Sequence, residues 1–424
     1  MKEYQSYAGY VGAVVLITLV PIMIYFLDLG YLNINMYAMV FSVVAITFIF
    51  MLFSEYILKS RYNRKNKIKV KFSSLHCSNL YILKSALIRF IALIVPFLIF
   101  YSIVQYHNYF VNNNLFESTK YFFTYLLYIF TILGLPYIFL TLKYRGAKNY
   151  EFKDYALLTI IGVKSIYNKL FNKNYKHKFY KNRRVIKVLR LYLVNFFFLT
   201  LMARFVVIEI DGLHNSISTI YSREYESFSW YMQFKVWYLA LFHLIFTVDV
   251  AIALIGYTFA SRWLNNRTKS VDSTLSGWLV ALMCYPPFNS VTSEFISYNG
   301  LNTHDFITNQ YILVAIYTII IFLYIIYVWA TISLGFKFSN LTNRGVVSIG
   351  PYKYVRHPAY ISKNLSWWLE NSFILTNIWA SIAMAMWNTI YVFRALTEER
   401  HLNKDSEYKN YCKKVKYRFI PKVI

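Results

Sequence analysis

The sequence predicts an all-α membrane protein, a polytopic bundle of about eight spans followed by a C-terminal helical hairpin. Three observations predict this fold class. Hydrophobic residues make up 58% of the chain and charged residues only 15%, too few to cover the surface of a soluble domain of 424 residues. Several uncharged runs reach about 18 residues or more, which is long enough for a helix to cross a bilayer. The charges are concentrated in the segments between these runs.

Eight apolar runs define the expected spans. The run with the weakest pattern contains Pro286 and Pro287. Proline interrupts the hydrogen bonds of a helix interior, so this span is predicted to be short, kinked or partly re-entrant. The expected spans lie near residues 9–29, 37–57, 86–106, 121–142, 191–210, 234–260, 275–292 and 310–334.

The net charge of +26 does not indicate nucleic-acid binding, because the basic residues lie in loops on one predicted side of the membrane. Residues 59–71 hold seven Lys and Arg and no acid, and residues 143–190 hold fourteen. The loop at 211–233 is acidic by contrast. The positive-inside rule then places both termini and the basic loops in the cytoplasm, where they also attract anionic lipids.

The run from Ile361 to Phe393 predicts a hairpin. As one helix it would be about 50 Å long, which exceeds the hydrocarbon thickness of about 30 Å. A fold-back near Asn371–Asn377 gives two short helices and brings the charged segments on either side to one interface. The predicted domains are an N-terminal transmembrane region of unassigned role at 1–270, with about six spans, and a core at 271–424. The cofactor site is expected within 345–424.

Two charged motifs flank this hairpin, RHPAY at 356–360 and TEERHL at 397–402. Proline is favoured in the first turn of a helix, so Pro358 predicts a helix that starts just after an Arg-His pair. The unpaired N–H groups of a helix start favour an anion. Opposite them lie the carboxylates of Glu398 and Glu399. A site of mixed charge suits a zwitterionic ligand or a nucleotide whose ribose hydroxyls a carboxylate can hold.

The two motifs resemble those of the isoprenylcysteine carboxyl methyltransferase and phospholipid methyltransferase family. These integral membrane enzymes carry RHPxYxG, a helical hairpin and then EExxL. The resemblance covers roughly residues 310–424. The glycine of the family motif is replaced by Ser362 in this chain. The matching residues are Arg356, His357, Pro358 and Tyr360, and then Glu398, Glu399 and Leu402.

The resemblance implies that the cofactor is S-adenosyl-L-methionine, bound at the cytosolic face. The helix start would hold its carboxylate, the paired carboxylates its ribose or ammonium group, and two tyrosines would pack on the adenosine. The predicted cofactor-binding residues are therefore Tyr354, Arg356, His357, Pro358, Tyr360, Glu398, Glu399 and Leu402.

The methyl acceptor is expected to be a lipid or a lipidated molecule that enters from the membrane. Arg418 is the candidate for holding an anionic acceptor, because guanidinium pairs bidentately with carboxylate or phosphate. Arg418 and Glu399 are the predicted catalytic residues, and Asn364, Glu370 and Arg418 are the predicted substrate-binding residues. A prenyl-cysteine carboxylate, a lipid phosphate and a phospholipid headgroup all remain open, and an amine acceptor would need a general base.

Two other function classes stay open at this point. The tail NYCKKVKYRFIP also resembles membrane sterol reductases, which use NADPH on a related scaffold, although the intact RHPAY and TEERHL motifs favour the methyltransferase. A transporter or lipid-binding protein is the non-enzymatic alternative, but the chain lacks two similar halves with paired broken spans. No metal site is predicted, because the spacing of Cys77, Cys284 and Cys412 is not that of metal ligands.

Overall fold

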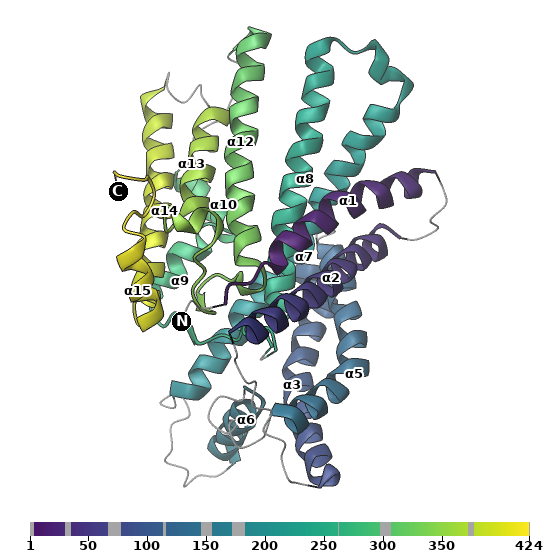
Figure 1. Ribbon diagram of the computed structural model, residues 1–424, viewed down its shortest axis with the longest axis vertical. Helices are drawn as coiled ribbons and strands as arrows, with labels where there is room; N and C mark the ends of the chain where they lie inside the picture. The colour runs from purple at the N-terminus through teal and green to yellow at the C-terminus, as the bar shows by residue number, and fades with distance from the viewer. Residues whose placement is uncertain are drawn as a thin grey trace. The chain divides into compact units, whose positions relative to one another are not determined.

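The computed structural model is mostly helical (Figure 1), which confirms the predicted all-α class. One pair of short antiparallel strands is present in the described part of the chain, β1 (Ser270–Val271) and β2 (Thr342–Asn343). The structure describes residues 4–29, 35–66, 78–112, 116–145, 155–171, 183–261, 263–296, 307–371 and 377–423.

Seven described helices are long and apolar enough to cross a membrane. They coincide with seven of the eight predicted spans, and so they confirm an integral membrane protein with several spans. Each forms from an apolar run whose backbone polar groups a helix satisfies internally. These helices are α1 (Ala8–Asp28), α2 (Met36–Lys65), α3 (Asn79–Tyr106), α5 (Glu117–Arg145), α7 (Arg183–Tyr221), α8 (Trp230–Thr258) and α12 (Gln310–Leu334).

The span predicted at 275–292 is not one continuous helix. The chain forms two short helices there, α9 (Leu275–Leu282) and α10 (Phe288–Phe295). The break falls at Pro286 and Pro287, which lack the backbone N–H that a continuing helix needs. The expected kink is therefore confirmed, and it divides the segment in two.

Shorter elements lie between the long helices. The segment 143–190, predicted as a loop, contains the helix α6 (Tyr155–Phe171). The predicted loop 59–71 begins inside α2, because that helix continues to Lys65. The remaining short elements before the C-terminal region are α4 (Asn108–Val111) and the 3₁₀ turn η3 (Arg223–Ser227).

By its contacts the chain divides into two compact units. Unit 1 comprises Met1–Ser60 together with Phe205–Ile424, and unit 2 comprises Arg61–Arg204. In unit 2, α3 and α5 pack through a small apolar core of Ile82, Ala86, Ile138 and Leu142. The functional boundary predicted between residues 270 and 271 stays a prediction, since the units are defined by packing.

Helix α12 is central to unit 1, where it contacts α1, α8 and α13. Helix α1 approaches it closely at Gly9, because a Cβ built there would lie 2.0 Å from the carbonyl oxygen of Ile332. The Tyr10 hydroxyl lies 2.9 Å from the Ser333 hydroxyl, and the indole N–H of Trp329 donates to Tyr10 at 3.0 Å. The first helix of the chain is thus fixed to the C-terminal region.

The predicted C-terminal hairpin is confirmed. Helix α13 (Pro358–Glu370) contacts both α14 (Ile378–Leu402) and α12, and it lies between them (Figure 1). Residues 372–376 of the predicted fold-back lie outside the described residues. The remaining elements are the 3₁₀ turns η4 (Gly335–Lys337) and η5 (Gly350–Lys353), and the last helix α15 (Ser406–Lys414).

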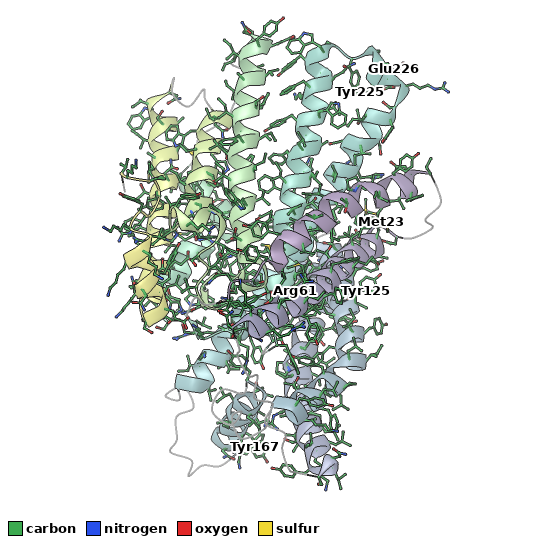
Figure 2. The ribbon with its side chains drawn as sticks, viewed as in Figure 1. Met23, Arg61, Tyr125, Tyr167, Tyr225 and Glu226 are labelled. Carbon is green, nitrogen blue, oxygen red and sulfur yellow. The ribbon has the colours of Figure 1, made fainter. Side chains whose placement is uncertain are left out.

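Contacts between distant parts of the chain mark the two ends of unit 1. At one end the Gln5 side-chain oxygen accepts a hydrogen bond from the Ser348 N–H at 3.3 Å, so the start of the chain lies beside the segment before η5. At the other end Trp230 stacks on Tyr311 with ring centroids 5.2 Å apart. Tyr225 and Glu226 lie in the acidic turn between α7 and α8 (Figure 2). The start of the chain and the C-terminal region therefore share one end of the unit.

Candidate functional site

The two charged motifs meet around the carboxylate of Glu399. Arg356 Nε donates to Glu399 Oε1 at 2.7 Å, and His357 Nε2 donates to the same oxygen at 3.2 Å. Arg418 Nε donates to Glu399 Oε2 at 3.0 Å. The side chains of Arg356, His357 and Glu399 are each less than one-tenth exposed. We call these four residues the Glu399 cluster.

The backbone before α13 positions this cluster. Pro358 is in the first turn of α13 and His357 is its N-cap, as the sequence predicts. The N–H groups of Arg356 and His357 donate to the carbonyl oxygens of Tyr417 and Arg418, at 3.0 and 2.8 Å. The guanidinium of Arg356 also donates to the backbone oxygen of Val415 at 3.1 Å. The C-terminal tail is thus fastened to the first motif over a gap of about sixty residues in sequence.

Glu399 lies in the last turn of α14, beyond the apolar run that ends at Phe393. Burial alone would raise the pKa of this carboxyl group. The hydrogen bonds from His357 and Arg418 and the positive charge of Arg356 outweigh burial and lower the pKa from 4.5 to about 2. Glu399 is therefore ionised, and its negative charge pairs with Arg356 and Arg418 of the same protein.

This lowered pKa predicts how stability depends on pH. A carboxyl group whose pKa is lower in the folded state stabilises the fold above its unfolded pKa, and that contribution is lost as pH falls towards the folded pKa. We therefore expect the contribution of Glu399 to be complete above pH 4.5 and to disappear between pH 4.5 and about 2. Melting temperatures of the detergent-solubilised protein between pH 7 and 2.5, compared with those of Glu399→Gln, measure it. Parallel curves for the two proteins would contradict the assignment.

The neighbouring Glu398 points to a different set of groups. Its Oε2 accepts a hydrogen bond from the Tyr360 hydroxyl at 2.7 Å, and the Tyr360 ring stacks on His357 with centroids 5.3 Å apart. Glu398 also lines a small cavity of about 20 Å³ together with Arg394 and Leu402. Such a volume holds about one water molecule. Two consecutive residues of α14 thus have different surroundings, because Glu399 lies in the Glu399 cluster and Glu398 lines the cavity.

Arg394 was not among the residues predicted from the sequence. Its side chain is buried, with 8% of the residue exposed, and its Nη2 donates to the Asn340 side-chain oxygen at 2.7 Å. The guanidinium carbon lies 5.2 Å from the ring centroids of Tyr285 and Tyr360. No carboxylate lies within 4.0 Å of Arg394 in the part of the chain that the structure describes. A buried guanidinium without a carboxylate counter-ion is suited to bind an anion.

The other predicted residues lie at varying distances from the cluster. Tyr354 is 62% exposed, so the structure does not bring it into the cluster. Asn364 donates to the backbone oxygen of Tyr360 at 2.7 Å, and its own side-chain oxygen is buried without a hydrogen-bond partner. Glu370 lies at the far end of α13 and accepts from the Tyr324 hydroxyl at 2.7 Å. Glu370 is therefore in the bundle interior and away from the two motifs.

Ser362 stands where the family motif has glycine, and the helix accommodates it. Its hydroxyl donates to the Pro358 carbonyl oxygen at 2.9 Å, and the residue is 2% exposed. Because glycine is about 1 kcal/mol less favourable than alanine inside a helix, we expect Ser362→Gly to lower the melting temperature without tightening cofactor binding. Thermal melting and calorimetric titration of the same preparation test both parts. A tighter cofactor complex in Ser362→Gly would show that the serine obstructs the site.

Taken together, the apolar helices and the C-terminal hairpin define an integral membrane protein with a buried polar site at one end of its bundle. Residues 313–404 match the model of the isoprenylcysteine carboxyl methyltransferase (ICMT) family, which confirms the resemblance seen in the two motifs. The matched region runs from α12 to just past α14 and supports a membrane methyltransferase. No curated protein and no solved structure matches the chain.

Proposed function

We propose that this protein transfers a methyl group from S-adenosylmethionine to an anionic lipid or lipidated acceptor at the cytoplasmic face of a membrane. The observation that carries the proposal is that the two family motifs are hydrogen-bonded to each other, Arg356 to Glu399 and Tyr360 to Glu398, beside a cavity that Arg394 and Glu398 line from the same helix. The positive-inside rule supports the cytoplasmic side, because the basic loops predicted from the sequence share a side with both termini.

The residues at the cavity fit the chemistry of this cofactor. S-adenosylmethionine would supply a methyl group on a positively charged sulfur. The Glu398 carboxylate can accept hydrogen bonds from hydroxyl or ammonium groups. The cavity of about 20 Å³ is far smaller than a nucleoside, so binding requires the walls of the cavity to move apart.

The Glu399 cluster has a positioning role in this proposal. Both carboxylate oxygens of Glu399 accept hydrogen bonds from cations of the protein, so little capacity is left for a ligand. We assign to Glu399 the task of holding Arg356 and His357 at the start of α13. Arg418 is partly exposed, at 42% of its side chain, and keeps the tail over the cluster.

We assign the acceptor's anionic group to Arg394. A carboxylate or phosphate oxygen held there attacks the methyl carbon with its own electron pair, and the electrons of the broken S–CH₃ bond remain on sulfur. No proton has to be removed in this reaction, so no general base is required. Arg394 would orient the acceptor and exclude water from it, and such positioning can lower a barrier by about 7–11 kcal/mol.

The two alternative functions have less support. The family match does not favour the reductase, because it assigns residues 313–404 to methyltransferases. A transporter finds no specific support in the described structure, and the intramembrane Asp249 is bonded to Tyr327 at 2.9 Å and Thr331 at 2.5 Å. We therefore put forward one function.

Calorimetric titration of the detergent-purified protein with S-adenosylhomocysteine, and with NADPH in parallel, tests this proposal. We expect saturable binding of S-adenosylhomocysteine alone, and transfer of labelled methyl groups from S-adenosylmethionine into an acidic lipid fraction. Saturable binding of NADPH alone would replace the methyltransferase with the reductase.

A further inference from the structure

One wall of the cavity comes from outside the region that matches the family model. It is formed by the segment from β1 to α9, which includes Asp272 and Gly277. Asp272 is 2% exposed, and its N–H donates to the carbonyl oxygen of Leu341 at 2.8 Å. The short strand pair β1–β2 thus fixes this carboxylate against the segment that precedes the first motif.

The Asp272 carboxylate has one oxygen bound locally and one that lies over a glycine, 3.8 Å from Nη2 of Arg400. Its Oδ1 accepts hydrogen bonds from the N–H and hydroxyl of Thr274, at 2.9 and 2.8 Å. A Cβ built on Gly277 would lie 2.2 Å from Oδ2. Glycine at this position therefore leaves the space that Oδ2 occupies at the cavity.

His401 presents an unpaired polar atom to the same cavity. The residue is 4% exposed, and its Nε2 lies 3.1 Å from the Ser270 hydroxyl. Its Nδ1 is buried and has no hydrogen-bond partner. Burial lowers the pKa of His401, so the ring is neutral and each nitrogen can take only one role, donor or acceptor. Buried polar atoms in native proteins are nearly always bonded, so an unpaired one at a cavity indicates a ligand or a water molecule.

The order of the residues along α14 indicates which part of a ligand reaches His401. Residues spaced by three or four positions share a helix face, so Arg394, Glu398 and His401 lie in a row. At 1.5 Å per residue, His401 is about 10 Å from Arg394 along the helix axis. A cofactor whose methyl group points towards an acceptor at Arg394 would place its nucleoside beside Glu398 and His401.

We propose that Asp272 and His401 join Glu398 to form a subsite for the ribose hydroxyls of the nucleoside cofactor. This inference rests on the proposed methyltransferase function and extends its cofactor site to His401, within the second motif, and to Asp272, which lies outside both motifs and outside the matched region. Carboxylates are the groups that proteins commonly use to hold ribose hydroxyls. Each of the two neighbouring ribose hydroxyls can donate a hydrogen bond to one of the two carboxylates. A hydroxyl oxygen can also accept a hydrogen bond from His401 Nδ1.

The test compares two ligands on the wild type, two variants and one control variant by calorimetric titration. The ligands are S-adenosylhomocysteine and its analogue that lacks the 2′ and 3′ hydroxyls. We expect the wild type to bind the analogue about a hundredfold more weakly, because two hydrogen bonds to carboxylates are lost. In Asp272→Asn and His401→Gln we expect S-adenosylhomocysteine itself to bind about tenfold more weakly, and the difference between the ligands to shrink to about tenfold.

Glu407→Gln is the matched control, since Glu407 is an exposed carboxylate that pairs with Lys269 and does not line the cavity. It should keep the wild-type preference for the hydroxyl-bearing ligand. If one substitution prevents folding, the other still gives the result, because the two residues lie on different elements. Equal binding of the two ligands by the wild type, or an unchanged preference in the folded variants, would overturn the ribose subsite and leave the methyltransferase in place. Failure of the wild type to bind S-adenosylhomocysteine at all would overturn both.

Discussion

Glu399→Gln is expected to destabilise the C-terminal region by about 3–5 kcal/mol, the usual cost of breaking a buried ion pair by removing one partner. The substitution keeps the shape of the side chain and removes its charge. Arg356, which is nearly buried, would then lose the anion that balances its charge, and His357 would lose its charged hydrogen-bond acceptor. The tail bearing Arg418 would also lose one of its attachments to α14.

Thermal melting of the detergent-solubilised protein measures this effect, and Glu398→Gln is its control. The control removes the same charge one residue earlier, where the carboxylate accepts a hydrogen bond from the Tyr360 hydroxyl and forms no ion pair with the residues that the structure describes. We expect Glu398→Gln to melt close to the wild type and to lose S-adenosylhomocysteine affinity by tenfold or more. The opposite pattern, with Glu399→Gln stable and unable to bind, would move the cofactor contact from Glu398 to Glu399.

Arg394→Lys is expected to lower the methyl-transfer rate constant kcat/KM by about a hundredfold while S-adenosylhomocysteine binding stays within about threefold. Lysine keeps the positive charge but loses the flat, two-pronged donor geometry that matches a carboxylate or phosphate. A hundredfold loss corresponds to about 2.7 kcal/mol of transition-state stabilisation. The guanidinium also donates to Asn340, so melting temperatures must accompany the rates.

Lys409→Met, which removes an exposed cation from α15, serves as the control for a general effect of positive charge. It should leave kcat/KM within about threefold of the wild type. An equal loss of cofactor binding and of rate in Arg394→Lys would mean that Arg394 contacts the cofactor. A full rate in that variant would remove the acceptor assignment altogether.

The transmembrane helices were predictable because each corresponds to one continuous run of apolar residues in the sequence. A run of about 20 apolar residues has few options in a membrane other than a helix, and seven such runs became α1, α2, α3, α5, α7, α8 and α12. The hairpin followed from length alone, since the run from Ile361 to Phe393 exceeds the bilayer. Pro286 and Pro287 predicted a break in the helix of segment 275–292, but the sequence did not predict the two separate helices α9 and α10.

The site was predictable only where its residues form motifs. The meeting of Arg356 with Glu399 follows from the hairpin. Arg394 was missed because a single arginine near the end of an apolar run usually indicates a side chain that reaches for the interface. Its partners Asn340 and Tyr285 lie 54 and 109 residues away in sequence, so no local pattern relates them. Likewise nothing near Asp272 in the sequence indicates that it faces His401.

The close contact of Gly9 with α12 has a consequence for the modularity of this protein. The region that matches the family model begins at residue 313, yet its first helix is covered by α1 and α8. A fragment cut at that boundary would expose the faces of α12 that Gly9 and Tyr10 now occupy. The matched region is therefore packed against helices that precede it in the chain. Any attempt to transplant its activity into another scaffold would have to carry the opening helix of the chain along with it.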